Sequence, residues 1–106
     1  MSKPQDVVIV YCTVPDADAG QRIAGHLVEY GLAACVTLVP GVTSIYRWKG
    51  RTETDTEALL MIKARAADYK ALETAIRSQH PYELPEIIAV PLCDGLEDYL
   101  NWIGTT

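Results

Sequence analysis

The side chains with the most chemical potential are concentrated in residues 80–86, which contain His80, Glu83 and Glu86 together with two prolines. Pro81 disfavours helical dihedral angles at the residue before it, so a helix that reaches His80 must end there. A histidine at that point can cap the negative end of the helix dipole, and capping is the simpler account of His80. Glu83 and Glu86 could converge on a cation or face water in a bent loop.

Three cysteines, Cys12, Cys35 and Cys93, are the other candidate reactive groups. Their odd number and wide spacing disfavour a disulfide framework and a structural zinc site, so free thiols in a reducing compartment are expected. A Cys–His nucleophile pair would need an orienting group and an oxyanion device, and neither is evident in the sequence. A phosphate-binding loop is also disfavoured, because no glycine-rich turn joins a strand to a helix.

Length and composition predict one globular domain that spans residues 1–106. The chain is 49% hydrophobic and 22% charged, which is typical of a folded protein with one core. Its net charge of −5 argues against a nucleic-acid partner. The basic side chains at positions 47, 49 and 51 are offset by acidic ones at 53, 55 and 57, as in a solvated hairpin.

No membrane partner is expected either. The longest charge-free run, residues 31–46, is shorter than the roughly 18 apolar residues of a spanning helix and contains proline, glycine and hydroxyl side chains. The first six residues lack the apolar core of a secretory signal. We therefore predict a cytoplasmic protein.

Hydrophobic patterning indicates which elements position these groups. Residues 6–13 form a β-branched run typical of a strand buried on both faces, and a helix should follow from Pro15 to Tyr30, ending at Gly31. The helix contains Gly20 and Gly25, and glycines tolerated inside a helix suggest close packing on a sheet.

A long hairpin is predicted next. Residues 33–48 read as one extended segment interrupted by a bulge or bend at Pro40-Gly41, and Lys49-Gly50 supplies a tight reversal into residues 51–64. Arms of about 15 residues exceed the usual 5 to 6, so the tip should project beyond the domain. Because it carries Tyr46 and Trp48 outward, the hairpin should pack on another surface.

The remaining elements are a helix capped by Asp68 that ends at His80, a strand over residues 86–91, and a short final helix opened by an Asp94/Glu97 capping box. The order β-α-β-β-α-β with a last helix predicts an α+β fold of the ferredoxin-like, split βαβ type, with an antiparallel four-stranded sheet and two helices on one face.

Five ordered blocks in this sequence resemble those of the CutA divalent-cation tolerance family. The blocks are residues 12–16 (CTVPD), 32–36 (LAACV), 40–50 (PGVTSIYRWKG), 80–87 (HPYELPEI) and 99–102 (YLNW). The resemblance implies a cytoplasmic homotrimer of ferredoxin-like subunits, similar in architecture to PII signalling proteins and linked to tolerance of copper and other divalent metals. It implies no enzymatic reaction.

The resemblance also implies a copper site. In such proteins copper ligation is assigned to the cysteine of the Cys-Thr-x-Pro block and to the histidine before Pro-Tyr, which here are Cys12 and His80, and Glu83 could add an oxygen ligand. Some members carry a second histidine where this chain has Gln79, a poor copper ligand. The alternative for Cys12 is a small buried hydrophobe. The alternative function is a PII-like trimeric sensor or scaffold that binds a small ligand or a protein partner at subunit clefts, with metal tolerance as an indirect effect.

Topology yields one further expectation. If the first and third strands run parallel, the second helix should end near the start of the first strand, far from Cys12. A Cys12/His80 site would then have to bridge two subunits.

Overall fold

The computed structural model describes residues 2–106 and confirms the expected order of elements. Four strands are formed by β1 (Val7–Val14), β2 (Cys35–Trp48), β3 (Arg51–Arg65) and β4 (Ile87–Pro91). The helices are α1 (Ala17–Glu29), α2 (Tyr69–Gln79) and α3 (Glu97–Thr105). Short 3-10 turns, η1 (Pro4–Asp6) and η2 (Ala66–Asp68), precede β1 and α2.

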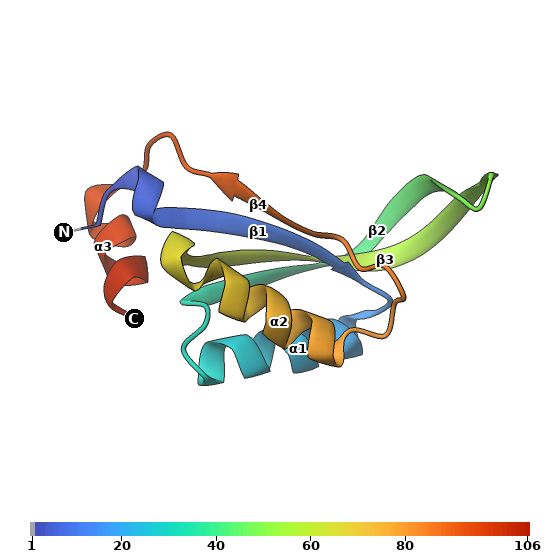
Figure 1. Ribbon diagram of the computed structural model, residues 1–106, viewed down its shortest axis with the longest axis horizontal. Coiled ribbons are helices and arrows are strands. Elements are labelled where there is room, and N and C mark those ends of the chain that lie inside the picture. Colours follow the sequence, from blue (N-terminus) through green and yellow to red (C-terminus); the bar gives the residue numbers. More distant parts are fainter. Residues whose placement is uncertain (1) are drawn as a thin grey trace.

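The strands form one antiparallel sheet in the order β2-β3-β1-β4 (Figure 1). β1 pairs with β3 in antiparallel register, so that Cys12 lies opposite Leu60. The expectation that the first and third strands run parallel is therefore wrong. Helix α2 follows β3 and runs back over the sheet antiparallel to it. The helix is therefore parallel to β1 and ends beside the C-terminal end of that strand.

Helices α1 and α2 cover one face of the sheet, and the core lies between them and the strands (Figure 1). Alternate residues of β1 and β3 are buried there, among them Val10, Cys12, Leu60 and Ile62. Strand β1 was predicted to be buried on both faces, but from Val8 onward its burial alternates because α1 and α2 cover only one of them. The two helices contribute Ile23 and Leu27 from α1, and Leu72 and Ile76 from α2.

Gly20 is where α1 approaches the sheet most closely. A Cβ atom at this position would lie 2.8 Å from Leu38 Cδ1 and 3.1 Å from Val14 Cγ2. Gly25 is different, because it is exposed and has no atom within 4 Å of such a Cβ. The expected close packing therefore holds for Gly20 only.

Substituting each glycine by alanine should distinguish the closely packed Gly20 from the exposed Gly25. We expect Gly20→Ala to lower the free energy of unfolding by about 1 to 3 kcal/mol, because the added methyl group overpacks the helix–sheet contact. Gly25→Ala is the matched control, and it should raise stability by up to about 1 kcal/mol through helix propensity alone. Denaturant unfolding of both variants measures the difference, and equal behaviour would contradict a tight contact at Gly20.

The hairpin β2–β3 extends beyond the body, which gives the molecule principal dimensions of 47 × 26 × 23 Å (Figure 1). The predicted bulge is confirmed by a register shift between Val39 and Val42, where Gly41 adopts a φ of 69°. The predicted reversal is also confirmed, since Lys49 and Gly50 both have positive φ, as a tight hairpin turn requires.

The predicted N-cap position of Asp68 is confirmed, whereas the predicted Asp94/Glu97 capping box is wrong. Asp68 is the N-cap residue of α2, but its carboxylate pairs with the Arg65 guanidinium at 2.7 Å and makes no capping bond. Asp94 accepts a hydrogen bond from the Gly95 N–H, and α3 begins only at Glu97 after Leu96. In both cases the carboxylate has a nearer partner than the helix N–H groups.

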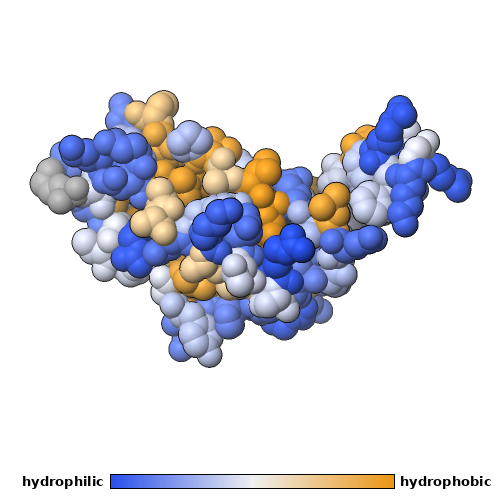
Figure 2. Space-filling view, viewed as in Figure 1, coloured by the Kyte–Doolittle hydropathy of each residue, from blue (hydrophilic) through white to orange (hydrophobic). Residues whose placement is uncertain are grey.

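In the described chain α1 and α2 leave the opposite face of the sheet uncovered, and α3 covers only one end of it, where Leu100 and Ile103 pack on Val7. The rest of this bare face is largely apolar. The apolar residues that point to it by register include Ile9, Tyr11, Leu59, Met61, Ile88 and Val90, and Lys63 points to it as well. Ile88 and Val90 are 54% and 42% exposed. Figure 2 shows hydrophobic surface in the middle of the body and a mostly hydrophilic hairpin tip.

Candidate functional site

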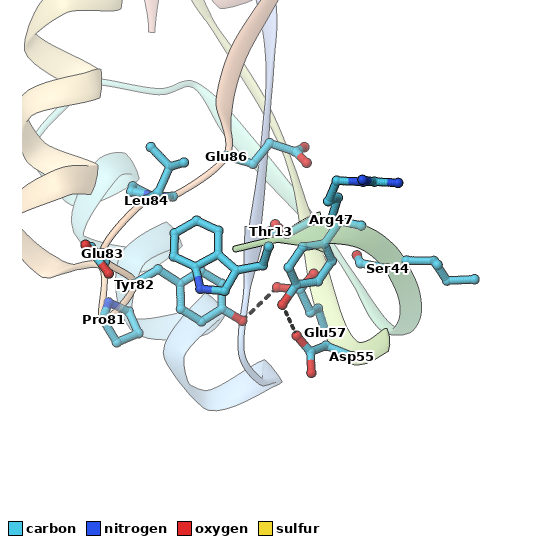
Figure 3. Close-up of a pocket in the computed structure, with 14 residues that line it drawn as sticks. Thr13, Ser44, Arg47, Asp55, Glu57, Pro81, Tyr82, Glu83, Leu84 and Glu86 are labelled. Carbon is cyan, nitrogen blue, oxygen red and sulfur yellow. Dashed lines mark hydrogen bonds between the residues drawn. The ribbon is translucent and has the colours of Figure 1, made fainter. Parts of the chain in front are cut away.

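A cavity of about 790 Å³ lies between the hairpin and the segment that joins α2 to β4 (Figure 3). It is lined by Thr13 of β1, by hairpin residues 44–48, by Asp55 and Glu57 of β3, and by residues 81–86. Four carboxylates line it, against the single guanidinium of Arg47. We call it the acidic cavity.

Two of the carboxylates that line this cavity accept hydrogen bonds from tyrosine hydroxyls. The Tyr82 hydroxyl donates to Glu57 Oε2 at 2.7 Å, and the Tyr46 hydroxyl donates to Asp55 (Figure 3). Burial, followed by the Glu57 hydrogen bond, raises the pKa of Tyr82. The hydrogen bond to Asp55 is the main reason that the pKa of Tyr46 is raised to about 12. Both phenols therefore remain donors at neutral pH.

Glu57 is the buried carboxylate of the group, with only 6% of its surface exposed. Within residues 2–106 its Oε2 atom accepts a hydrogen bond from the Tyr82 hydroxyl, whereas Oε1 has no hydrogen-bond partner. No buried side-chain oxygen of the described chain lacks a partner, so Oε1 must be accessible to solvent, and Glu57 lines the cavity.

His80 is held between two backbone groups rather than placed free at the helix end. Its Nδ1 accepts the Tyr82 N–H at 3.1 Å, and its Nε2 lies 2.8 Å from the Thr13 carbonyl oxygen. The ring is 9% exposed and packs on the Tyr82 ring, with 4.7 Å between centroids. Thus the imidazole fastens the start of the 80–86 segment to the end of β1.

Cys12 is on the same end of β1 as His80. Its thiol is fully buried and lies 3.7 Å from the Thr13 carbonyl oxygen, the atom that His80 Nε2 also contacts. The structure therefore brings Cys12 and His80 together within one chain, and the expectation that they lie at opposite ends of the strand is wrong. No second subunit is needed to bring them close.

The Cys12 thiol is protonated at neutral pH. Burial, with smaller contributions from the negative charges of Glu86 and Glu57, raises its pKa from 9.0 to about 12. Because metals bind the thiolate, Cys12 must lose its proton before it can bind copper.

Glu83 is exposed and lines the acidic cavity, as does Glu86. Within residues 2–106, no three side chains of histidine, cysteine, aspartate or glutamate gather closely enough to hold a metal ion. Ligation by Cys12, His80 and Glu83 stays a prediction, and it would require rearrangement of these groups or ligands from elsewhere.

Glu57, Asp55, Tyr46 and Tyr82 were not identified as site residues from the sequence. One signal was available for Glu57, because it is the last charged residue before the apolar run of β3. A carboxylate at such a boundary can be buried because the apolar residues that follow it in the strand are buried. Its pairing with Tyr82, 25 positions away, has no local sequence signature.

Together, the antiparallel sheet, the two helices on one face, the projecting hairpin and the acidic cavity at its base define a small α+β protein with a candidate cation site. The family model described as "CutA1 divalent ion tolerance protein" matches residues 8–106. This chain belongs to the CutA1 divalent ion tolerance family.

Individual relatives agree with the family match. The divalent-cation tolerance protein CutA of Pectobacterium atrosepticum is 43% identical over 95% of this chain and 92% of its own length. The chloroplastic protein CutA 1 of rice is 45% identical over 91% of this chain, which spans only 54% of that protein. The crystal structure of CutA from Xylella fastidiosa superposes with a TM-score of 0.91 at 46% identity, covering 94% of this chain and 96% of that one.

Proposed function

We propose that this protein is a cytoplasmic homotrimer that binds a divalent cation in the acidic cavity and acts in the response to metal ions, without an enzymatic reaction. The family description of divalent ion tolerance supports an interaction with metal ions. No helix among residues 2–106 is long and apolar enough to span a membrane. The cytoplasmic location rests on the sequence alone, and the rice relative is named as chloroplastic.

The observation that carries the cation proposal is the hydrogen bonding of the two Glu57 carboxylate oxygens. A buried carboxylate oxygen needs a positive or hydrogen-bonding partner. Tyr82 serves Oε2, whereas Oε1 is accessible to solvent, and Glu57 lines a cavity that is also lined by Asp55, Glu83 and Glu86. Carboxylate oxygens and water are the preferred ligands of hard divalent cations, and a cation that retains water needs only one or two protein ligands.

Copper bound by Cys12 and His80 is the ligand set that the family resemblance implies. The thiol pKa of about 12 and the two hydrogen bonds of the imidazole both oppose it in the conformation described. We therefore place the first cation contact at Glu57 and treat copper as one candidate metal among several.

Removing the Glu57 charge should weaken cation binding. We expect Glu57→Gln to raise the dissociation constant for Zn²⁺ at least about tenfold, or about 1.4 kcal/mol, because the amide still accepts from Tyr82 but carries no charge. Isothermal titration with Zn²⁺, Mn²⁺ and Cu²⁺ measures this.

Glu29→Gln is the matched control for that experiment. Glu29 is exposed at the end of α1 and does not line the acidic cavity, so the substitution makes the same charge change at another place. Its zinc affinity should equal that of the unmodified protein. If both substitutions weaken zinc binding equally, the attraction is that of the whole acidic chain and the proposed site is wrong.

A small organic ligand is the second candidate, and the composition of the cavity walls favours it. Trp48, Tyr82, Leu84 and Pro85 give the acidic cavity apolar surfaces, and its volume is within the range of small-molecule pockets. Native mass spectrometry of untagged, freshly purified protein distinguishes the two functions. A co-purifying organic molecule would favour a PII-like sensor, and a stoichiometric metal would favour the cation site.

A further inference from the structure

We infer that His80 is a positioning residue of the acidic cavity, fixed as the Nε2–H tautomer, which acts on Glu57 through Tyr82 without binding the metal. The inference rests on the proposed cation site for its effect on affinity. The tautomer and the link to Glu57 can be tested without any metal.

The partners of the ring determine its tautomer. A backbone N–H can only donate, so the 3.1 Å contact with the Tyr82 N–H requires an unprotonated Nδ1. A carbonyl oxygen can only accept, so the 2.8 Å contact with Thr13 requires a proton on Nε2. Both contacts are satisfied at once by a single species, the neutral ring protonated on Nε2.

This species has no free lone pair for a metal. A metal binds a ring nitrogen through its lone pair, and here the single lone pair belongs to Nδ1 and accepts the Tyr82 N–H. Ligation through Nε2 would break the bond to Thr13 and force a change of tautomer, while ligation through Nδ1 would release the backbone of Tyr82. At 9% exposure the ring also offers little of its surface to a metal ion.

The same two bonds connect the ring to the cavity. Thr13 is at the end of β1 and itself lines the cavity, whereas Tyr82 is two residues beyond His80 in the loop. Fixing the Tyr82 backbone, and packing on its ring, places the phenol so that it reaches Glu57 on β3 at 2.7 Å. These contacts connect the end of β1, the 80–86 segment and β3. The Tyr82–Glu57 hydrogen bond then orients the Glu57 carboxylate and its other oxygen.

Nitrogen-15 NMR of the histidine ring tests the tautomer directly. We expect the Nδ1 signal of His80 at the position of an unprotonated nitrogen and the Nε2 signal at that of a protonated one, with both unchanged after saturation with Zn²⁺. His26, on α1, is the internal comparison. A large shift of either His80 signal on zinc addition would show ligation and overturn the inference.

Substitutions test the link to Glu57. His80→Gln retains a donor for the Thr13 carbonyl, His80→Ala retains neither contact, and Tyr82→Phe breaks only the last link. Without metal, the carboxyl carbon signal of Glu57 should move in His80→Ala and in Tyr82→Phe, and less in His80→Gln. An unmoved Glu57 signal in His80→Ala would overturn the positioning role whether or not any cation binds.

Zinc titration of the same proteins then tests the effect on the site. Affinity should fall severalfold in both His80→Ala and Tyr82→Phe, with the double substitution costing less than the two single effects combined, and His80→Gln should recover part of the loss. Equal losses in His80→Gln and His80→Ala, with Tyr82→Phe unaffected, would make His80 a ligand. Absence of zinc binding to the unmodified protein would remove the cation proposal and leave the NMR tests to decide the inference.

Discussion

A single charge on the bare face of the sheet is expected to abolish the trimer. Met61 lies at the centre of that face, opposite Tyr11 on β1 and Thr37 on β2. Its neighbours Leu60 and Ile62 point the other way into the core. If the face is buried between subunits, Met61→Glu must take a carboxylate out of water beside Lys63, whose ammonium already bonds the Thr37 hydroxyl and the Met61 carbonyl, and this burial costs several kcal/mol in each subunit.

Size-exclusion chromatography with light scattering at low micromolar concentration measures the assembly state. The unmodified protein should have the mass of three chains, and Met61→Glu should be monomeric or unfolded, because a small subunit with a large apolar surface depends on its partners for stability. Ala71→Glu, on the exposed side of α2, adds the same charge as a control and should leave the trimer intact. A folded monomer of the unmodified chain would disprove the trimer.

The hairpin was predictable because its signals are local. Pro40-Gly41 lacks a ladder donor and permits a positive φ, and Lys49-Gly50 fits a tight turn, so a window of a few residues contains the information. The order of elements followed for the same reason, since the change from strand to helix periodicity is visible within each segment.

Strand direction was mispredicted even though the connectivity of the chain contains it. The crossover through α1 brings β2 back parallel to β1, and the tight turn at Lys49-Gly50 then reverses β3. It follows that α2 runs along β1 and that His80 arrives beside Thr13. The wrong strand direction therefore also gave a wrong prediction for the metal site, because it put Cys12 and His80 at opposite ends of β1.

The cavity could not be predicted from the sequence either, and the reason differs from that for the strand direction. Glu57 meets Tyr82 only because the base of the hairpin and the 80–86 segment lie at the same end of the sheet. Such a pair depends on side-chain directions across three segments, and no spacing rule within one segment encodes it. The missing capping bonds of Asp68 and Asp94, whose carboxylates bind nearer partners, show the same limit on a smaller scale.

Cys12 should be nearly inert toward alkylation in the folded protein. An increase of its pKa from 9.0 to about 12 lowers the thiolate fraction at neutral pH about a thousandfold, and full burial slows the reaction further. Cys93 is exposed and provides the internal reference. Mass spectrometry after timed iodoacetamide treatment should find Cys93 modified and Cys12 unmodified until denaturant is added.

The same thiol should make the protein sensitive to alkali. Below about pH 9, Cys12 is protonated in both the folded and the unfolded chain, so ionisation of this thiol does not alter stability. Between about pH 9 and pH 12 the unfolded chain releases the proton first, and stability falls with rising pH by up to about 4 kcal/mol. Cys12→Ala removes this contribution, so its stability should decline less over that interval.

Denaturant unfolding at pH 8, 9.5 and 11 measures this difference. Tyr46 and Tyr82 titrate in both proteins, so their contributions cancel in the comparison with Cys12→Ala. A parallel decline of the two proteins, or alkylation of folded Cys12 at the rate of Cys93, would show that the thiol is accessible and ionisable. In that case copper binding through a Cys12 thiolate would regain its physical basis, because the cost of forming the thiolate is what now opposes it.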